Sequence, residues 1–273
     1  MIGLNLLYIL IIIFYCLSVL GYFIDFIQNN QKVNRLAFWL LSIVWVLQLL
    51  FLSLRAFEYS RLPIMTIFEG MFFYAWVLVT FSLIINKLYR MDFLVFIVNL
   101  VGFSILTVSL FAQAGDVSPE LSDLLISELL IIHIVVLLIS YAMFTLSFSF
   151  SMLYFFQHQM LKQKRWGEKM QRTGNLSNLE RFSFLFALIG VPLMMIGLIL
   201  GVIWAWVKFE TFPWYDLKVI SSFILLIVYG CYLFQYQFKK RRGYSLALLN
   251  IAAFLVLLIN YFLSSSFSEF HIW

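Results

Sequence analysis

Long apolar stretches separated by short polar connections dominate this chain. Eight stretches are close to or above the roughly 20 residues that a helix needs to cross about 30 Å of hydrocarbon. They cover residues 3–26, 36–54, 64–88, 93–112, 124–156, 182–207, 217–238 and 245–263. Their apolar residues run continuously instead of alternating, which favours helices over the strands of a closed barrel. The pattern predicts an all-α integral membrane protein, a bundle of eight transmembrane helices in a single polytopic domain covering residues 1–273.

Composition excludes a soluble domain. The chain is 64% apolar and 11% charged, whereas a soluble globular domain carries about 25% charged residues. The first stretch lacks a basic n-region and a small-residue cleavage site, so we expect no removable signal peptide. Cys16 and Cys231 lie in different stretches and form no Cys-x-x-Cys motif, so covalent haem attachment is not encoded.

The distribution of basic residues predicts the orientation. Fourteen of the 18 lysines and arginines lie in one alternate set of connections, with six of them between residues 158 and 181. Cytoplasmic connections retain basic residues, so both termini are predicted to be extracytoplasmic. The net charge of +5 then reflects contact with the lipid bilayer and requires no nucleic acid.

Two of the three histidines lie on the predicted external face. The stretch 124–156 is longer than one span needs, and counting about 20 residues back from Phe156 places His133 at the outer interface. His271 follows the eighth stretch and is also external, whereas His158 is expected at a solvated helix end on the opposite face. An isolated histidine usually forms an ordinary hydrogen bond, but two on one face could supply both axial ligands of a haem iron.

A dense aromatic segment, residues 204–218, reaches the same external face. Its aromatic and charged members include Trp204, Trp206, Trp214, Tyr215, Asp216 and Lys218. Aromatic residues gather at bilayer interfaces, and such a belt accounts for Trp206. The remaining loop, with a few polar groups among its aromatic rings, is typical of a surface that binds a large planar cofactor.

These residues carry a family resemblance. From its second stretch onward the chain resembles the haem-handling membrane proteins of cytochrome c assembly (the CcmC/CcsA superfamily), and within them the HemX-like branch. Those proteins have an external tryptophan-rich "WWD" segment in which Trp-Ala precedes Asp-Pro-Lys-Glu, and this chain keeps Trp204-Ala205, Asp216 and Lys218 at the same spacing. It departs from the pattern at Leu217 and Val219, and at Phe209, where the family usually has tryptophan.

Further motifs follow the family order. The family has a histidine ahead of Ser-Tyr-Ala, which His133 and Ser140-Tyr141-Ala142 match, and another histidine after the last helix, which His271 matches. The segment from Pro63 to Glu69 is similar to the family's Pro-x-x-x-x-Tyr-Glu, with Phe68 in the tyrosine position.

The resemblance implies that the protein binds haem b non-covalently and presents it at the external face. It implies His133 and His271 as axial metal ligands, and Trp204, Trp214 and Tyr215 as the surface that packs on the porphyrin. Asp216 and Lys218 would order the loop or meet the propionates. Other cytochrome c assembly proteins are then the expected partners.

Other external ionisable residues are weaker candidates. Glu69 lies inside the third stretch, where a functional role and an ordinary hydrogen-bonded role are both open. The external basic residues are Arg55, Arg61, Lys208 and Lys218. Each could pair with a haem propionate or extend to the interface as lysine and arginine commonly do. The position of Lys218 favours it for the propionates.

Two alternatives to haem presentation remain open. The HemX-like branch implies a membrane regulator that controls the level of glutamyl-tRNA reductase, a haem-biosynthesis enzyme, through the cytoplasmic connection 158–181. A transporter of another small molecule is the second alternative, although the sequence lacks the repeated pair of broken helices that marks midplane sites. No nucleophile–base pair, phosphate loop or metalloprotease motif is present, so we expect no enzyme activity.

Overall fold

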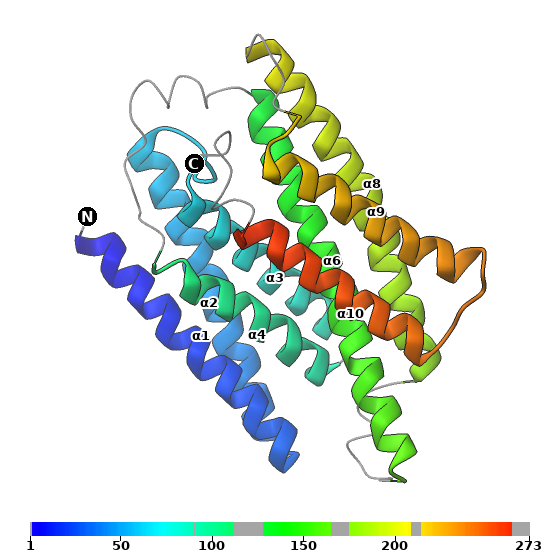
Figure 1. Cartoon of the computed structure of the whole chain (residues 1–273). Helices are drawn as coiled ribbons and strands as arrows, with labels where there is room; N and C mark the ends of the chain where they lie inside the picture. Colours follow the sequence, from blue (N-terminus) through cyan, green and yellow to red (C-terminus); the bar gives the residue numbers. More distant parts are fainter. Residues whose placement is uncertain (1, 90, 112–127, 165–174, 209–213, 264–273) are drawn as a thin grey trace. The chain divides into compact units, whose positions relative to one another are not determined.

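The computed structural model describes residues 2–89, 91–111, 128–164, 175–208 and 214–263, in which the regular structure is helical throughout (Figure 1). The helices are α1 Ile2–Gln28, α2 Gln31–Tyr59, α3 Ile67–Tyr89, α4 Asp92–Val108, α6 Glu128–Lys162, α8 Leu176–Lys208, α9 Leu217–Gln237 and α10 Tyr244–Leu258, which continues as the π-helix η1 Ile259–Leu263. Within the described ranges, seven helical segments are long and apolar enough to cross a membrane, and α4 is a shorter apolar helix of 17 residues. The predicted all-α multi-span fold class is confirmed, whereas the orientation of the termini stays a prediction.

Several helix boundaries follow from local side-chain chemistry. The Asn30 side chain accepts a hydrogen bond from Lys32 N at 3.1 Å and so caps the start of α2. At the start of α3, Thr66 Oγ1 accepts from Glu69 N and the Glu69 carboxylate accepts from Thr66 N, which is the reciprocal capping box. Ser60 ends α2 with a left-handed backbone, φ 51°.

The helices group into two compact units, which we describe separately. In the first unit α1 and α3 each contact α2 and α4, which closes a ring of four helices. In the second unit α6 and α9 each contact α8 and α10, which closes another ring. The single polytopic domain that the sequence suggests stays a prediction.

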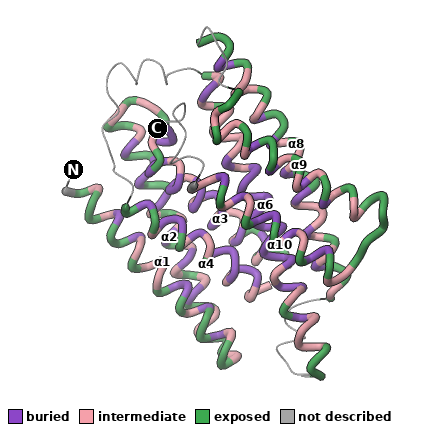
Figure 2. The backbone as a smooth tube through the Cα atoms, viewed as in Figure 1, coloured by how far each residue is buried: buried purple, intermediate pink, exposed green. Residues whose placement is uncertain are grey.

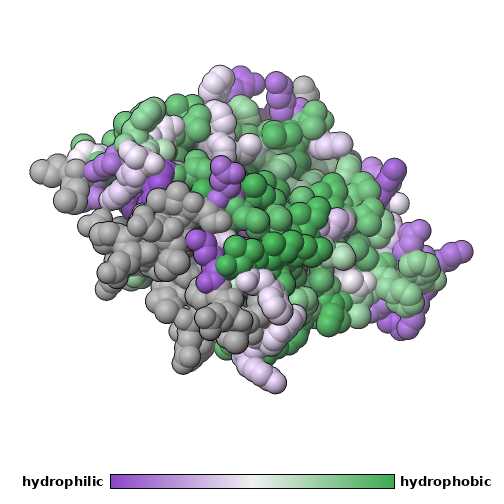
Figure 3. Space-filling view, turned by 90° about the horizontal axis from the view of Figure 1, so that it is seen from above, coloured by the Kyte–Doolittle hydropathy of each residue, from purple (hydrophilic) through white to green (hydrophobic). Residues whose placement is uncertain are grey.

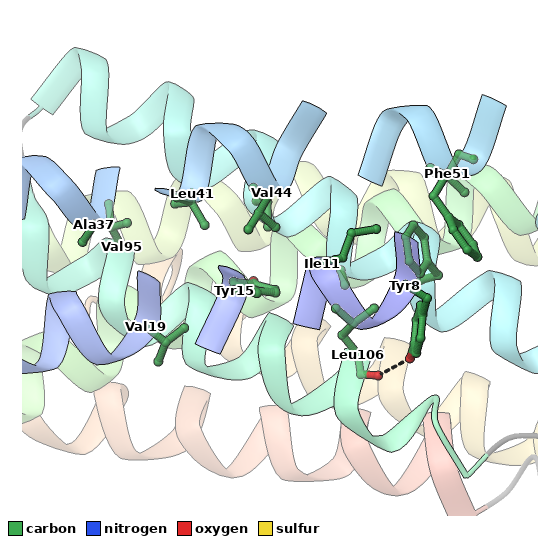
Figure 4. Packing of buried hydrophobic residues seen from close by; sticks show 14 of the residues in the cluster. Tyr8, Ile11, Tyr15, Val19, Ala37, Leu41, Val44, Phe51, Val95 and Leu106 are labelled. Carbon is green, nitrogen blue, oxygen red and sulfur yellow. Dashed lines mark hydrogen bonds between the residues drawn. The ribbon is translucent and has the colours of Figure 1, made fainter. Parts of the chain in front are cut away.

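Aromatic side chains fill the core of the first unit. The rings of Tyr8, Phe51, Phe68 and Phe72 lie with centroids 4.5 to 6.2 Å apart. Figure 4 shows Tyr8 among its apolar neighbours, where its hydroxyl donates to the Leu106 carbonyl at 3.0 Å. The polar atom of the ring therefore has a partner inside the apolar core, as burial requires.

Asn99 of α4 is the second polar anchor of this unit. Tyr15 Oη donates to Asn99 Oδ1 at 2.9 Å, and Asn99 Nδ2 donates to Ser82 Oγ at 2.9 Å. The Tyr15 ring reaches this position over Gly102, where an added Cβ would lie 2.5 Å from the tyrosine oxygen. Gly102 thus makes room for a hydrogen bond between α1 and α4.

The second unit is held by a buried polar cluster. Asn250 Nδ2 of α10 lies 2.8 Å from each of three serine hydroxyls, those of Ser147, Ser151 and Ser183. Tyr232 of α9 adds its hydroxyl, 3.0 Å from Ser183 Oγ. Four helices therefore meet at one set of hydrogen bonds, which is a common means of joining helices within a bilayer.

The outward-facing side chains are largely apolar. In Figure 2 most helices carry both buried and exposed residues. The middle of α6 differs, since residues 140–151 are buried on every side. Large apolar side chains remain exposed in both units, for example Leu36 at 60% and Ile199 at 55%. On the face drawn in Figure 3 such residues form broad continuous areas. Exposed apolar surface of this extent marks contact with lipid or a partner instead of water.

We predict that Gly102→Ala destabilises the first unit by about 1–3 kcal/mol, because the new methyl group displaces the Tyr15 hydroxyl and breaks its bond to Asn99. Gly230→Ala is the matched control, since nothing lies within 4 Å of its added Cβ. The check is the heat-unfolding midpoint of the full-length protein in detergent. Equal midpoints for the two variants would show that the Gly102 contact is unimportant.

Candidate functional site

His133 lies in the second turn of α6 and packs against α8. Its Nδ1 is 2.6 Å from the carbonyl oxygen of Gly197. Since a carbonyl can only accept, Nδ1 carries the proton and Nε2 keeps its lone pair. Among the described residues Nε2 has no hydrogen-bond partner. A histidine oriented in this way, with Nδ1 bonded to a backbone carbonyl, is the usual form of a metal-ligating imidazole.

Three glycines of α8 let α6 approach closely enough for this bond. An added Cβ would lie 2.6 Å from the Phe144 ring at Gly190, 2.5 Å from Leu137 at Gly197 and 2.7 Å from His133 Nδ1 at Gly201. The glycines at positions 190, 197 and 201 therefore form a flat face on α8. The imidazole occupies the space that a side chain at position 201 would take.

The sequence-predicted aromatic residues separate into two environments. Trp204 and Ala205 continue the Gly197–Gly201 side of α8 and are buried, Trp204 at 4% exposure. Trp214 and Tyr215, just ahead of α9, are exposed at 54% and 95%. The structure therefore places Trp204 inside the second unit and the other two rings on its surface. Residues 209–213 between them, and His271, lie outside the described residues.

Asp216 has a clear local role. Its Oδ1 accepts hydrogen bonds from Lys218 N at 2.9 Å and Val219 N at 3.3 Å, so the carboxylate caps the start of α9. This bond fixes where the loop ends and the helix begins.

Lys218 points towards the end of α10. Its Nζ donates to the Asn260 carbonyl at 2.7 Å, and it lies 5.8 Å from the centre of the Tyr261 ring. Asn260 belongs to the π-helix η1, and such wide turns often occur at functional sites. Lys218 thereby links the start of α9 to the π-helix at the end of α10.

Asn260 is a site residue that sequence reasoning did not identify. Its Oδ1 accepts from Tyr141 Oη at 2.9 Å, and its Nδ2 donates to Ser221 Oγ and Ser222 Oγ. It therefore joins the fourth turn of α6 and the start of α9 to the end of α10. The available signal was the Ser-Tyr-Ala motif, since Tyr141 binds Asn260 and Ser140 Oγ donates to the Gly190 carbonyl at 2.9 Å.

We call this region, where α6 and α9 begin and α8 and α10 end, the His133 end of the second unit. It contains an imidazole held through Nδ1, the buried Trp204 indole, the exposed rings of Trp206, Trp214 and Tyr215, and the ammonium groups of Lys208 and Lys218. Such a set can bind a transition metal inside a large planar ligand. Among the described residues no cluster of three or more His, Cys, Asp or Glu side chains could hold a bare metal ion.

Glu69 and two of the external arginines form an ionic cluster in the first unit. Arg55 Nε and Arg61 Nη1 each donate to the Glu69 carboxylate at 2.8 Å, and the Glu69 side chain is 1% exposed. Of the two roles left open for Glu69, the structure shows the hydrogen-bonded one. The fourth external basic residue, Lys208, is exposed at the end of α8.

His158 lies one turn before the end of α6, where its imidazole is half-buried instead of fully solvated. Its ring packs near those of Tyr154 and Tyr244, with centroids 6.2 and 5.1 Å away. Its Nδ1 is buried without a hydrogen-bond partner in the described structure. The α6 helix runs on to Lys162, and the start of α10 covers this imidazole.

Comparisons with known proteins agree on one family. The family model described as "Cytochrome C assembly protein" matches residues 64–272. "Protein HemX" of Bacillus subtilis (strain 168) is 48% identical over 260 residues, covering 95% of this chain and 94% of that protein. "Protein HemX" of Brevibacillus brevis is 41% identical over 266 residues, covering 97% of each.

More distant relatives extend the similarity. "Cytochrome c biogenesis protein CcsA" of Prochlorococcus marinus (strain MIT 9301) is 28% identical, covering 86% of this chain and 82% of that protein. Among solved structures, "Cytochrome c Heme Lyase CcmF" matches with a TM-score of 0.66 at 14% identity. The match covers 94% of this chain and 46% of that chain, so the protein spans about half the length of the lyase. This likeness concerns the fold alone.

Proposed function

Because the chain belongs to the cytochrome c assembly protein family, in its HemX-like branch, we propose that it binds haem b non-covalently and presents it at the His133 end. The observation that supports this most directly is the His133 imidazole. Its Nδ1 is held by the Gly197 carbonyl, and its Nε2 remains available as an axial ligand. The proposal makes the protein a binding and presenting component and not an enzyme.

The neighbouring groups support the same ligand. Trp214 and Tyr215 offer exposed rings beside the capped start of α9, and Trp204 is buried near the end of α8. Lys218 Nζ donates to the Asn260 carbonyl at 2.7 Å, and a propionate could replace this acceptor with a stronger, charge-assisted bond. His271 is proposed as the second axial ligand. Presentation outside the bacterial membrane, with both termini extracytoplasmic, is part of the same proposal.

The HemX relatives favour a second candidate function. In this case the chain controls the level of a haem-biosynthesis enzyme, glutamyl-tRNA reductase, through the connection 158–181. The haem site would then serve as a sensor. Under the first function the partners are other cytochrome c assembly proteins.

We predict that His133→Ala weakens haem binding at least about 100-fold, because a direct ligand contributes more than the outer-shell partners whose loss costs about 10–100-fold. The measurement is the reduced absorption spectrum and haem content of the purified protein. His158→Ala, on the other predicted face, is the matched control and should retain the haem bands. Haem bands that survive replacement of both His133 and His271 would contradict the ligand assignment.

We predict that Gly201→Ala lowers haem affinity about 10–100-fold without removing any ligand, because the added methyl group occupies the space of the His133 ring. Haem titration of the purified variant provides the test. Gly230→Ala controls for a general effect of adding a methyl group to a helix glycine. Unchanged affinity in Gly201→Ala would mean that the observed ring position is not the binding position.

A cellular experiment separates the two functions. If the chain regulates an enzyme, replacing residues 158–181 with an unrelated polar linker should change the glutamyl-tRNA reductase level and leave haem binding intact. If it presents haem, His133→Ala should lower the yield of c-type cytochromes. Both levels are read by immunoblot and haem staining. A yield of c-type cytochromes that is unchanged in His133→Ala counts against presentation.

A further inference from the structure

The Arg55–Glu69–Arg61 cluster of the first unit has one carboxylate for two guanidinium groups. All three side chains are nearly buried, at 8%, 1% and 12% exposure respectively. The cluster therefore carries a net charge of +1 in a poorly hydrated place, where an uncompensated charge is costly. Glu58, the single acidic residue of α2, is exposed and forms no ion pair with the described residues.

The Glu69 carboxylate is already saturated. Its Oε1 accepts from Arg55 Nε at 2.8 Å and Arg61 Nη2 at 3.2 Å. Its Oε2 accepts from Arg61 Nη1 and from the backbone N–H groups of Met65 and Thr66, at 2.8, 2.9 and 3.2 Å. Five hydrogen bonds exceed the roughly four acceptor sites of a carboxylate. No acceptor capacity remains for the rest of the Arg55 guanidinium.

The two Nη atoms of Arg55 are consequently without a hydrogen-bond partner among the described residues, and neither is completely buried. The guanidinium group lies between two aromatic rings, with its Cζ 5.1 Å from the centres of both Tyr59 and Phe68. These rings and the bond to Glu69 hold the group in a fixed orientation. Its free edge presents two parallel donors, the arrangement that binds a phosphate or carboxylate in a two-pronged manner.

The position of Arg55 indicates which oxyanion is available. It lies one turn before the end of α2, whose other side carries the exposed apolar residues Leu50, Leu54 and Phe57. Lipids that pack against this apolar side of α2 would have their headgroups near the end of the helix. The distribution of basic residues also predicts that this end of α2 lies on the external face. The rule that sets the orientation of the chain concerns cytoplasmic basic residues, so it does not account for Arg55.

We call the two Nη atoms of Arg55 the Arg55 edge. From these contacts we infer that the Arg55 edge is a binding site for a phosphate group, supplied by an anionic phospholipid or by free phosphate. The site lies in the first unit and is independent of the haem proposal. Tyr59 and Phe68 flank the guanidinium group, and Glu69 positions it. Arg61 contributes charge but no free edge, since both of its Nη atoms bind Glu69.

The test is the heat-unfolding midpoint of the full-length protein in nonionic detergent, titrated with sodium phosphate against sodium chloride at equal ionic strength. Phosphate should raise the midpoint of the native protein in a saturable manner. Arg55→Gln should raise the apparent dissociation constant at least about tenfold, and Arg55→Lys should do so to a smaller extent, because lysine keeps the charge and loses the paired donors.

Lys32→Gln is the matched control. It removes the same charge from the same helix but leaves the Arg55–Glu69–Arg61 cluster intact, so its apparent dissociation constant should change less than about threefold. Equal losses in Arg55→Gln and Lys32→Gln would overturn the site, because net charge alone would then explain the effect. His133→Ala should behave as the native protein does, which separates this test from that of haem binding.

A second titration identifies the source of the phosphate. Phosphatidylglycerol is compared with diacylglycerol of the same acyl chains, in the native protein and in Arg55→Gln. Stabilisation by phosphatidylglycerol that depends on Arg55, with a weaker effect of sodium phosphate, assigns the site to a lipid headgroup. An equal effect of sodium phosphate assigns it to free phosphate. If neither compound stabilises the native protein more than Arg55→Gln, the inference is wrong.

Discussion

The close contact between α6 and α8 is the constraint on which the proposed site depends. Glycines at positions 190, 197 and 201 remove side chains from one side of α8, and Phe144, Leu137 and His133 of α6 occupy the space. Only at this separation does His133 Nδ1 reach the Gly197 carbonyl. That single bond sets the imidazole tautomer and leaves Nε2 with its lone pair. The chemistry of the histidine is thus a consequence of helix packing.

The same physical rule organises both units. Inside hydrocarbon no water satisfies a polar group, so each buried donor or acceptor finds a protein partner or costs free energy. In the first unit Asn99 forms hydrogen bonds with Tyr15 and Ser82. In the second unit Asn250 forms hydrogen bonds with serines of two helices. These two asparagines join helices within the core of each unit, whereas Asn260 lies among the predicted binding residues at the His133 end. Its bonds to Tyr141 and Lys218 connect the packing of three helices to the predicted binding residues.

Charges at the helix ends serve different purposes in the two units. In the first unit, Glu69 closes the capping box of α3 and orients Arg55, leaving a pair of N–H groups for an oxyanion. In the second, Asp216 caps α9 and Lys218 bonds a carbonyl. In each unit a carboxylate accepts hydrogen bonds from backbone N–H groups at the start of a helix, and a basic side chain lies nearby. The haem proposal for the second unit draws on family membership, whereas the phosphate proposal for the first unit rests on geometry alone.

Hydropathy along the sequence determined the helices, because the length of an apolar stretch is a local property that the bilayer thickness translates directly into a span. The motifs around His133 and residues 204–218 likewise directed attention to one end of the second unit. Tertiary structure alone decided that Trp204 is buried while Trp214 and Tyr215 are exposed, that Lys218 meets Asn260, and that Arg55 and Arg61 share Glu69. These outcomes depend on how helices far apart in sequence rotate and approach one another. His133 and Gly197 are 64 residues apart, and no local pattern encodes the distance between them.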